Sequence, residues 1–166
     1  MGWGDIQGHE AVKRVFQTHL ASEQIASAYL LVGPDGIGKR MLAQEMAKAL
    51  NCLAPSAQDR PCDACIPCRH IARHIHPDVH WLSPGGSSDQ VKIDAVRQVL
   101  GRIALRPFSG RYQAVLLDGA HRLTEEAANS LLKSLEEPPA HTRFVLTTSQ
   151  LSRCLPTITS RCQLVR

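Results

Sequence analysis

The sequence reads Gly33-Pro34-Asp35-Gly36-Ile37-Gly38-Lys39-Arg40 at the point that decides the fold, and its pattern is G-x-x-x-x-G-K. The apolar segment 27–32 before it predicts a short buried strand, and the Ala-, Leu-, Met- and Lys-rich segment 41–50 after it predicts a helix. Glycines let the backbone curl so that N–H groups point at phosphate oxygens, and the start of the next helix adds a positive dipole. The stretch therefore predicts a phosphate-binding loop, in preference to an ordinary glycine-rich turn.

Within this loop, the residues expected to cradle phosphate are Gly33, Gly36, Gly38 and Lys39, and the lysine would reach the outer phosphates. A Ser or Thr hydroxyl normally holds Mg²⁺ at the next position. Arg40 stands there instead, and its cationic side chain cannot ligate a metal and would repel one. We therefore expect ATP binding to be weak or absent, with no turnover.

Beyond the loop, the apolar pattern alternates between helix-like and strand-like segments. Further helices are predicted at 10–20, 93–105 and 124–137, the last capped by Thr124 and stopped by two prolines. Further strands are predicted at 79–82, 112–117 and 143–147. This alternation favours an α/β fold, a parallel sheet flanked by helices.

Composition limits the class of protein. The 166 residues, with 43% hydrophobic and 20% charged side chains, are typical of one domain with an aliphatic core. The longest apolar runs are far shorter than the ~20 residues of a membrane span, and no signal-peptide core follows Asp5 and Glu10, so we expect a cytoplasmic protein without membrane contact. The formal charge of +4 permits contact with nucleic acid without requiring it.

Of the six cysteines, a tight cluster is formed by Cys52, Cys62, Cys65 and Cys68, with the spacing Cys-x9-Cys-x2-Cys-x2-Cys. Cytosolic thiols stay reduced, which favours a metal site over a disulfide framework. Two overlapping Cys-x2-Cys steps can curl thiolates around one ion, and a fourth thiolate from the end of the preceding helix completes a tetrahedron. We predict a structural zinc module inserted at about 52–68.

Two other interpretations of this cluster stay open. The thiols could carry no ligand, or nearby histidines could share the metal. The histidines concerned are His70, His74, His76 and His80. Because four cysteines already complete a tetrahedral zinc site, we favour these histidines as surface or packed residues, and we expect no open coordination position for catalysis.

The predicted strand at 112–117 runs into Asp118-Gly119-Ala120-His121. Asp118 stands where a strand-end aspartate would hold Mg²⁺ through water, although it could be an ordinary surface carboxylate. ATPases of the AAA+ kind have a glutamate at the next position to polarise the attacking water, and Gly119 offers no base. Arg40 and Gly119 thus depart from an ATPase at the two positions that chemistry requires.

Two further motifs indicate a family. The segment 126–139, EAANSLLKSLEEPP, is similar to the central signature of bacterial clamp-loader subunits, and Ser160-Arg161-Cys162 is similar to their SRC motif. With the four-cysteine insert and DGAH in place of DEAH at 118–121, the chain resembles the delta-prime family of DNA polymerase III clamp-loader subunits from about Gly8 to Arg166.

This resemblance implies an AAA+ domain in a ring-like assembly that opens a sliding clamp and closes it around primed DNA during replication. It implies a rigid, non-hydrolysing subunit whose partners are the gamma/tau ATPase and the clamp-opening subunit, with the clamp contacted indirectly. Arg161 would be an arginine finger that reaches the ATP site of a neighbouring ATPase, and is otherwise a surface arginine. Thr147 or Thr148 matches the sensor-1 region of the family.

The resemblance also implies an extent. Residues 1–166 correspond to the N-terminal AAA+ domain, and the helical lid and collar domains of the family are expected to be absent from a truncated chain.

Two alternative functions remain. A gamma/tau-type ATPase shares the zinc module, the signature helix and the SRC motif, but Arg40 and Gly119 argue against it. A zinc-containing nucleic-acid-binding module would use a group of arginines near one helix, although helical charges of this kind are usually a solvated face. These arginines are Arg97, Arg102, Arg106 and Arg111.

Overall fold

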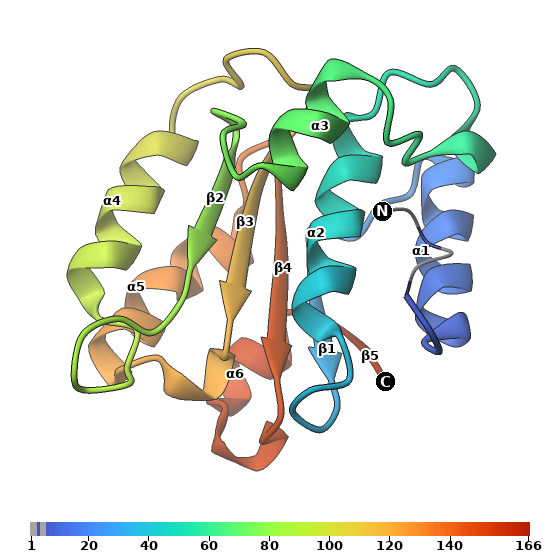
Figure 1. Ribbon diagram of the computed structural model, residues 1–166. Coiled ribbons are helices and arrows are strands. Elements are labelled where there is room, and N and C mark those ends of the chain that lie inside the picture. The colour runs from blue at the N-terminus through green and yellow to red at the C-terminus, as the bar shows by residue number, and fades with distance from the viewer. Residues whose placement is uncertain (1–2, 4–5) are drawn as a thin grey trace.

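The computed structural model describes residue 3 and residues 6–166, and these form a five-stranded sheet covered by helices (Figure 1). The strands are β1 (Ala28–Val32), β2 (Val79–Leu82), β3 (Gln113–Asp118), β4 (Thr142–Thr148) and β5 (Gln163–Val165). The helices are α1 (Glu10–Ser22), α2 (Lys39–Asn51), α3 (Ile66–Ala72), α4 (Ile93–Ile103), α5 (Glu125–Glu136) and α6 (Pro156–Thr159). Short 3₁₀ turns are η2 (Ala57–Asp59), η3 (Ala120–Arg122) and η4 (Leu151–Arg153).

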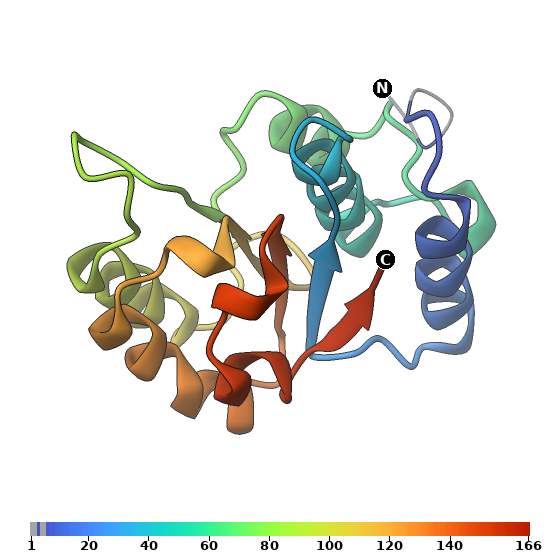
Figure 2. The same cartoon turned by 90° about the horizontal axis from the view of Figure 1, so that it is seen from below.

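The sheet has the strand order β2-β3-β4-β1-β5, and every neighbouring pair of strands is parallel. Both of its faces are buried. Successive residues of β1 point to opposite faces, so Tyr29 and Leu31 pack with α1 and α2, whereas Leu30 packs with the helices of the other face. Figure 2 shows α1 and α2 on one side of the sheet and α4 and α5 on the other. The predicted fold class, a parallel sheet flanked by helices, is confirmed.

Each of the eight predicted helices and strands is present, with ends within two residues of the prediction. The cap of α5 is also as predicted, because the Thr124 hydroxyl accepts a hydrogen bond from the Ala127 N–H at 3.1 Å. The prediction missed α3, α6 and β5. These are short elements in polar or turn-rich sequence, and β5 is a three-residue edge strand with no apolar run of its own.

The parallel sheet decides where a functional site can lie. The carboxyl ends of all the strands meet at one edge, at the bottom of Figure 1, and the loop 33–38 leaves β1 there. At the same edge, the register pairs Asp118 with Thr147 and Val32 with Thr148. Among the described residues, no helix has the length and apolar character needed to cross a membrane.

Candidate functional site

A cavity of about 370 Å³ lies at the carboxyl ends of β1, β3 and β4. It brings together most of the residues that the sequence suggested for nucleotide binding. Those that line it are Gly36, Gly38, Lys39, Arg40, Asp118, Thr147 and Thr148. Gly33, by contrast, begins the loop and is not among the lining residues. The loop, the strand-end aspartate and the two threonines therefore form one site.

The candidate phosphate-binding loop is held by Lys39. Gly36 and Gly38 have φ angles of 82° and 92°, in the left-handed region that glycine adopts readily. Lys39 is the first residue of α2 and is buried, and its ammonium donates to the carbonyl oxygens of Gly33 at 2.7 Å and Pro34 at 2.6 Å. A phosphate in the cavity must draw this ammonium away from two carbonyls.

Arg40 occupies the neighbourhood where a magnesium ion would be held. Its guanidinium donates to Asp118 Oδ2 at 3.1 Å and stacks 4.2 Å above the ring centroid of Trp81. The other carboxylate oxygen of Asp118 accepts from the Thr147 hydroxyl at 2.9 Å. Both oxygens of the carboxylate are thus engaged by side chains of the protein, and a fixed cation stands beside them.

Gly119 differs from the glutamate of an ATPase in its backbone conformation as well as in its lack of a carboxylate. Its φ of 88° lies in the left-handed region, and a Cβ added there would come within 3.2 Å of Arg122 Cδ. Its N–H donates to the Thr147 hydroxyl, also at 3.2 Å. A glutamate at this position would therefore have to adopt a strained backbone conformation.

Sequence analysis missed several cavity residues, among them His121, the last residue of the DGAH segment, and Arg122 directly after it. His121 Nδ1 lies 2.8 Å from the Thr148 hydroxyl, and burial lowers the pKa of this histidine. The Arg122 guanidinium donates to the carboxylate of Asp89 at 2.7 Å, and Asp89 lies in the loop between β2 and α4. The signal available in the sequence was their position directly after β3, at the sheet edge where the site lies.

Arg161 lies outside this cavity, between α6 and β5. Its guanidinium bonds to Glu136 Oε1 at 2.6 Å, at the last residue of α5, and donates to the Thr157 carbonyl at 2.7 Å. The side chain of Arg161 is 31% exposed. The structure therefore joins the SRC motif to the signature helix α5, on the surface of the protein.

The four predicted cysteine ligands come together. The sulfur atoms of Cys52, Cys62, Cys65 and Cys68 all lie within 4.8 Å of one another, and those of Cys52 and Cys65 are 4.0 Å apart. Thiolates at about 2.3 Å from one zinc ion would lie about 3.8 Å apart, by tetrahedral geometry. Cys52 follows the last residue of α2, and Cys65 precedes α3. The cluster can hold a metal ion, and its donor set is compatible with zinc.

The electrostatics of the cluster also suit a cation. Hydrogen bonds from the N–H groups of Ala64 and Cys65 lower the pKa of the Cys62 thiol to about 7. Burial raises the pKa of Cys52 and of Cys68. Since the thiolate is the form that binds metal, a cation at the centre offsets the cost of ionising these two buried thiols.

Three of the four nearby histidines have other partners. His76 accepts from the Asp78 N–H at 3.0 Å, His80 lies 2.8 Å from the Gln113 side-chain oxygen, and the ring of His74 packs beside Trp81. Among the described residues, the group of His, Cys, Asp and Glu side chains placed to hold a metal consists of the four cysteines alone.

The arginines proposed for nucleic-acid contact do not form one free set. All four arginines are exposed, and Arg111 in addition donates to the carbonyl oxygen of Cys52 at 3.0 Å. Arg111 therefore links the loop before β3 to Cys52, the residue that follows α2.

Comparison with known proteins agrees with this architecture. The chain is 44% identical over 139 residues to DNA polymerase III subunit delta' of Pseudomonas aeruginosa, which covers 84% of the chain and 42% of that protein. It is 38% identical over 158 residues to DNA polymerase III subunit gamma of Buchnera aphidicola, covering 95% of the chain and 43% of the relative. The chain thus spans less than half the length of these relatives.

A solved structure gives the same result for the fold. The crystal structure of a DNA polymerase III gamma subunit-related protein of Thermotoga maritima superposes with a TM-score of 0.67 at 26% identity, over 94% of this chain and 44% of that one. The family model for DNA polymerase III, delta subunit, matches residues 8–166. Because that match spans nearly the whole sequence, this chain belongs to the DNA polymerase III delta subunit family.

Proposed function

We propose that the chain is the N-terminal AAA+ domain, residues 1–166, of a DNA polymerase III clamp-loader subunit, and that it supports the loading of a sliding clamp without hydrolysing ATP itself. The observation that carries this proposal is the ion pair between Arg40 and Asp118. A cation held beside the strand-end aspartate competes with Mg²⁺, and phosphoryl transfer depends on that metal. Gly119 stands in place of the glutamate that would polarise the attacking water, so the base is missing as well.

Nucleotide or anion binding is a separate property of the same cavity. The loop glycines and Lys39 still form a phosphate cradle at the start of α2, which supports weak binding without turnover. Thr148 also lines this cavity, and its hydroxyl is already hydrogen-bonded to His121.

Arg161 is the group we propose to act in a neighbouring subunit. A guanidinium stabilises the charge that develops on a transferring phosphoryl group, and it can do so across an interface. Arg161 lies on the surface and away from the cavity of its own chain, which supports a role in another chain's ATP site. The partners implied are the gamma/tau ATPase and the clamp-opening subunit, with the clamp and primed DNA reached through the assembly.

Zinc is the metal we propose for the four cysteines, at the insert of about 52–68 between α2 and β2. Four thiolates leave no open position, so the ion would be structural and would fix the end of α2 to α3. Metal analysis of protein purified without chelator should give one zinc per chain, and clearly less than one would remove this assignment.

A gamma/tau-type ATPase is the second candidate, favoured by the 38% identity to a gamma subunit over 95% of the chain. Arg40 and Gly119 argue against it, and so does the positive φ at 119, which would strain a glutamate there. The two candidates differ in whether this chain turns over ATP.

The arginine-finger proposal is tested in a reconstituted clamp loader. Arg161→Ala should lower the ATPase rate of the assembly, because the one site it serves loses about 10³-fold or more. Arg14→Ala, an exposed arginine on α1, is the matched control and should leave the rate unchanged. An unchanged rate for Arg161→Ala would exclude the finger.

A further inference from the structure

Asp63 adopts an uncommon backbone conformation at the centre of the cysteine cluster. It lies between Cys62 and Cys65, and its φ of 60° falls in the left-handed region. Aspartate tolerates this region better than most residues, but the conformation is still disfavoured relative to an ordinary turn. Some contact must therefore hold Asp63 in place.

The conformation at 63 directs backbone N–H groups toward the sulfur atoms. The N–H of Cys65 donates to the sulfur of Cys62 at 3.3 Å, and the N–H of Cys62 donates to the sulfur of Cys52, also at 3.3 Å. The turn at Asp63 thus aims N–H donors at the proposed ligands.

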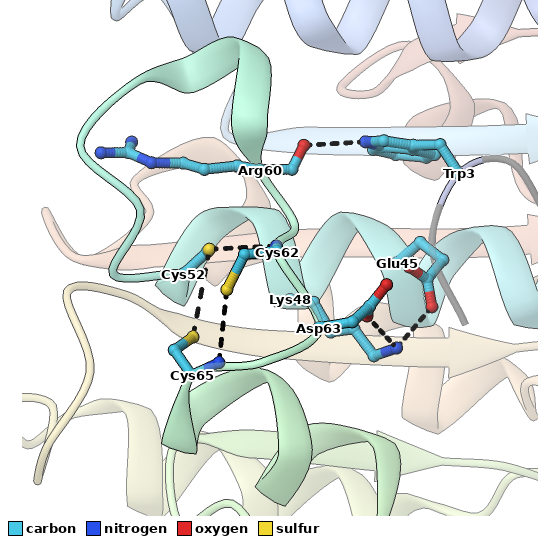
Figure 3. A network of polar contacts seen from close by, with 8 residues as sticks. All are labelled: Trp3, Glu45, Lys48, Cys52, Arg60, Cys62, Asp63 and Cys65. Atoms are coloured by element: carbon cyan, nitrogen blue, oxygen red, sulfur yellow. Dashed lines mark hydrogen bonds and ion pairs between the residues drawn. The ribbon is translucent and has the colours of Figure 1, made fainter.

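The side chain of Asp63 leads away from the sulfurs to α2. Its carboxylate accepts from the ammonium of Lys48 at 3.0 Å, and Lys48 also donates to Glu45 at 2.7 Å (Figure 3). The side chains of Lys48 and Glu45 are 1% and 3% exposed. A buried ammonium of this kind requires anionic partners. Asp63, whose side chain is 26% exposed, supplies one of them beside Glu45.

The same helix supplies both Lys48 and, at its end, Cys52. The ion pair therefore ties the turn that contains Cys62 and Cys65 to the helix that delivers the first ligand. Without it, Asp63 could relax to an ordinary φ, and the N–H groups would turn away from the sulfurs.

We propose that Asp63 is a positioning residue for the metal: its ion pair with buried Lys48 holds the Cys62–Cys65 turn in the geometry that binds zinc. Asp63 does not itself touch the ion. The inference rests on the proposed zinc site. Groups that orient metal ligands in this way typically contribute about 10- to 100-fold to metal affinity.

The test is the zinc affinity of the purified protein, measured by competition with a chelator of known affinity. Asp63→Asn keeps the size of the side chain and its tolerance of the left-handed conformation but loses the charge, so it should bind zinc at least about tenfold more weakly. Asp59→Asn, an exposed aspartate of the same insert, is the control and should bind as the unchanged protein does. Equal affinity for Asp63→Asn and the unchanged protein overturns the proposal.

A second variant separates the ion pair from the backbone conformation. Asp63→Gly adopts a positive φ without strain but cannot pair with Lys48, so it too should bind zinc more weakly. If Asp63→Gly binds zinc as tightly as the unchanged protein, the backbone alone positions the turn and the role of the ion pair is excluded. Absence of zinc binding by the unchanged protein would instead reject the zinc site itself.

Discussion

The guanidinium of Arg40, in the first turn of α2, lies 3.1 Å from the carboxylate of Asp118 at the end of β3. This pair joins the phosphate-binding loop to the strand that would hold the metal. Since both side chains are substantially exposed, the pair contributes little to folding stability, about 0–1 kcal/mol. Its importance is its position, because a cation is already present where an ATPase would bind Mg²⁺.

Replacing this arginine should change the metal dependence of nucleotide binding. Arg40→Thr frees Asp118 and supplies the hydroxyl that normally ligates Mg²⁺, so Mg-ATP should bind more tightly than to the unchanged protein. Titration calorimetry with and without Mg²⁺ measures this, with Arg106→Thr as the control for loss of one exposed arginine. If Arg40→Thr gains no magnesium-dependent affinity, Arg40 is not what excludes the metal.

Gly119 should be sensitive to any side chain. Gly119→Ala places a Cβ on a left-handed backbone and should lower the free energy of unfolding by about 1–2 kcal/mol. Gly101→Ala is the matched control: it lies within α4, with nothing inside 4 Å of its added Cβ, and it should raise stability by about 0.5–1 kcal/mol. Urea denaturation measures both. Equal effects of the two substitutions would show that the conformation at 119 carries no cost.

Glu136 should matter for the proposed finger. Glu136→Gln removes the charge that holds Arg161 at 2.6 Å, so the finger should be less well oriented. The ATPase rate of a reconstituted loader should therefore fall. The change should be smaller than that of Arg161→Ala. Glu137→Gln, an exposed neighbour, should have no effect. A rate equal to that of the unchanged loader would mean that Glu136 does not position Arg161.

Buried Asp78 should make stability depend on pH. Burial raises the pKa of Asp78, but hydrogen bonds from the N–H groups of Ser109, Phe108 and Gly110 outweigh it and hold the pKa below its usual value. The unfolded state therefore binds the proton more readily. The stabilisation is complete above an unfolded pKa of about 3.9 and is lost as the pH falls through the lower folded value.

Asp78→Asn should thus lower the free energy of unfolding at pH 7 by about 2 kcal/mol, through the loss of hydrogen bonds to a charged acceptor. The difference from the unchanged protein should shrink as the pH falls below about 4, because the unfolded state then binds a proton that the native carboxylate binds only at lower pH. Urea denaturation at pH 7 and pH 3 checks both statements. A difference that stays constant with pH would contradict the depressed pKa of Asp78.

The fold was largely predictable because the decisive signals are local. The loop pattern at 33–40, the capping Thr124 and the apolar periodicities lie within short segments, and each produced the expected element. The strand order was not predictable, since nothing in the sequence of β1 specifies that β4 and β5 lie on its two sides. Strand pairing of this kind follows from packing of the whole domain.

The candidate site, like the fold, was predictable from the sequence only in part. The candidate phosphate loop and the cysteine cluster could be recognised from residue spacing alone. The pairs of Arg40 with Asp118, Arg161 with Glu136 and Lys48 with Asp63 could not, because they join charged residues that are distant in sequence and common on any surface. Only the structure identifies which of many acidic residues each one meets.

The central claim, that this chain does not hydrolyse ATP, is tested most directly by a turnover assay on the purified protein with Mg-ATP, beside Lys39→Ala prepared in the same way. The account predicts no phosphate release above that of Lys39→Ala, whether or not nucleotide binds. Magnesium-dependent hydrolysis that Lys39→Ala abolishes would contradict it and would favour the gamma/tau-type ATPase.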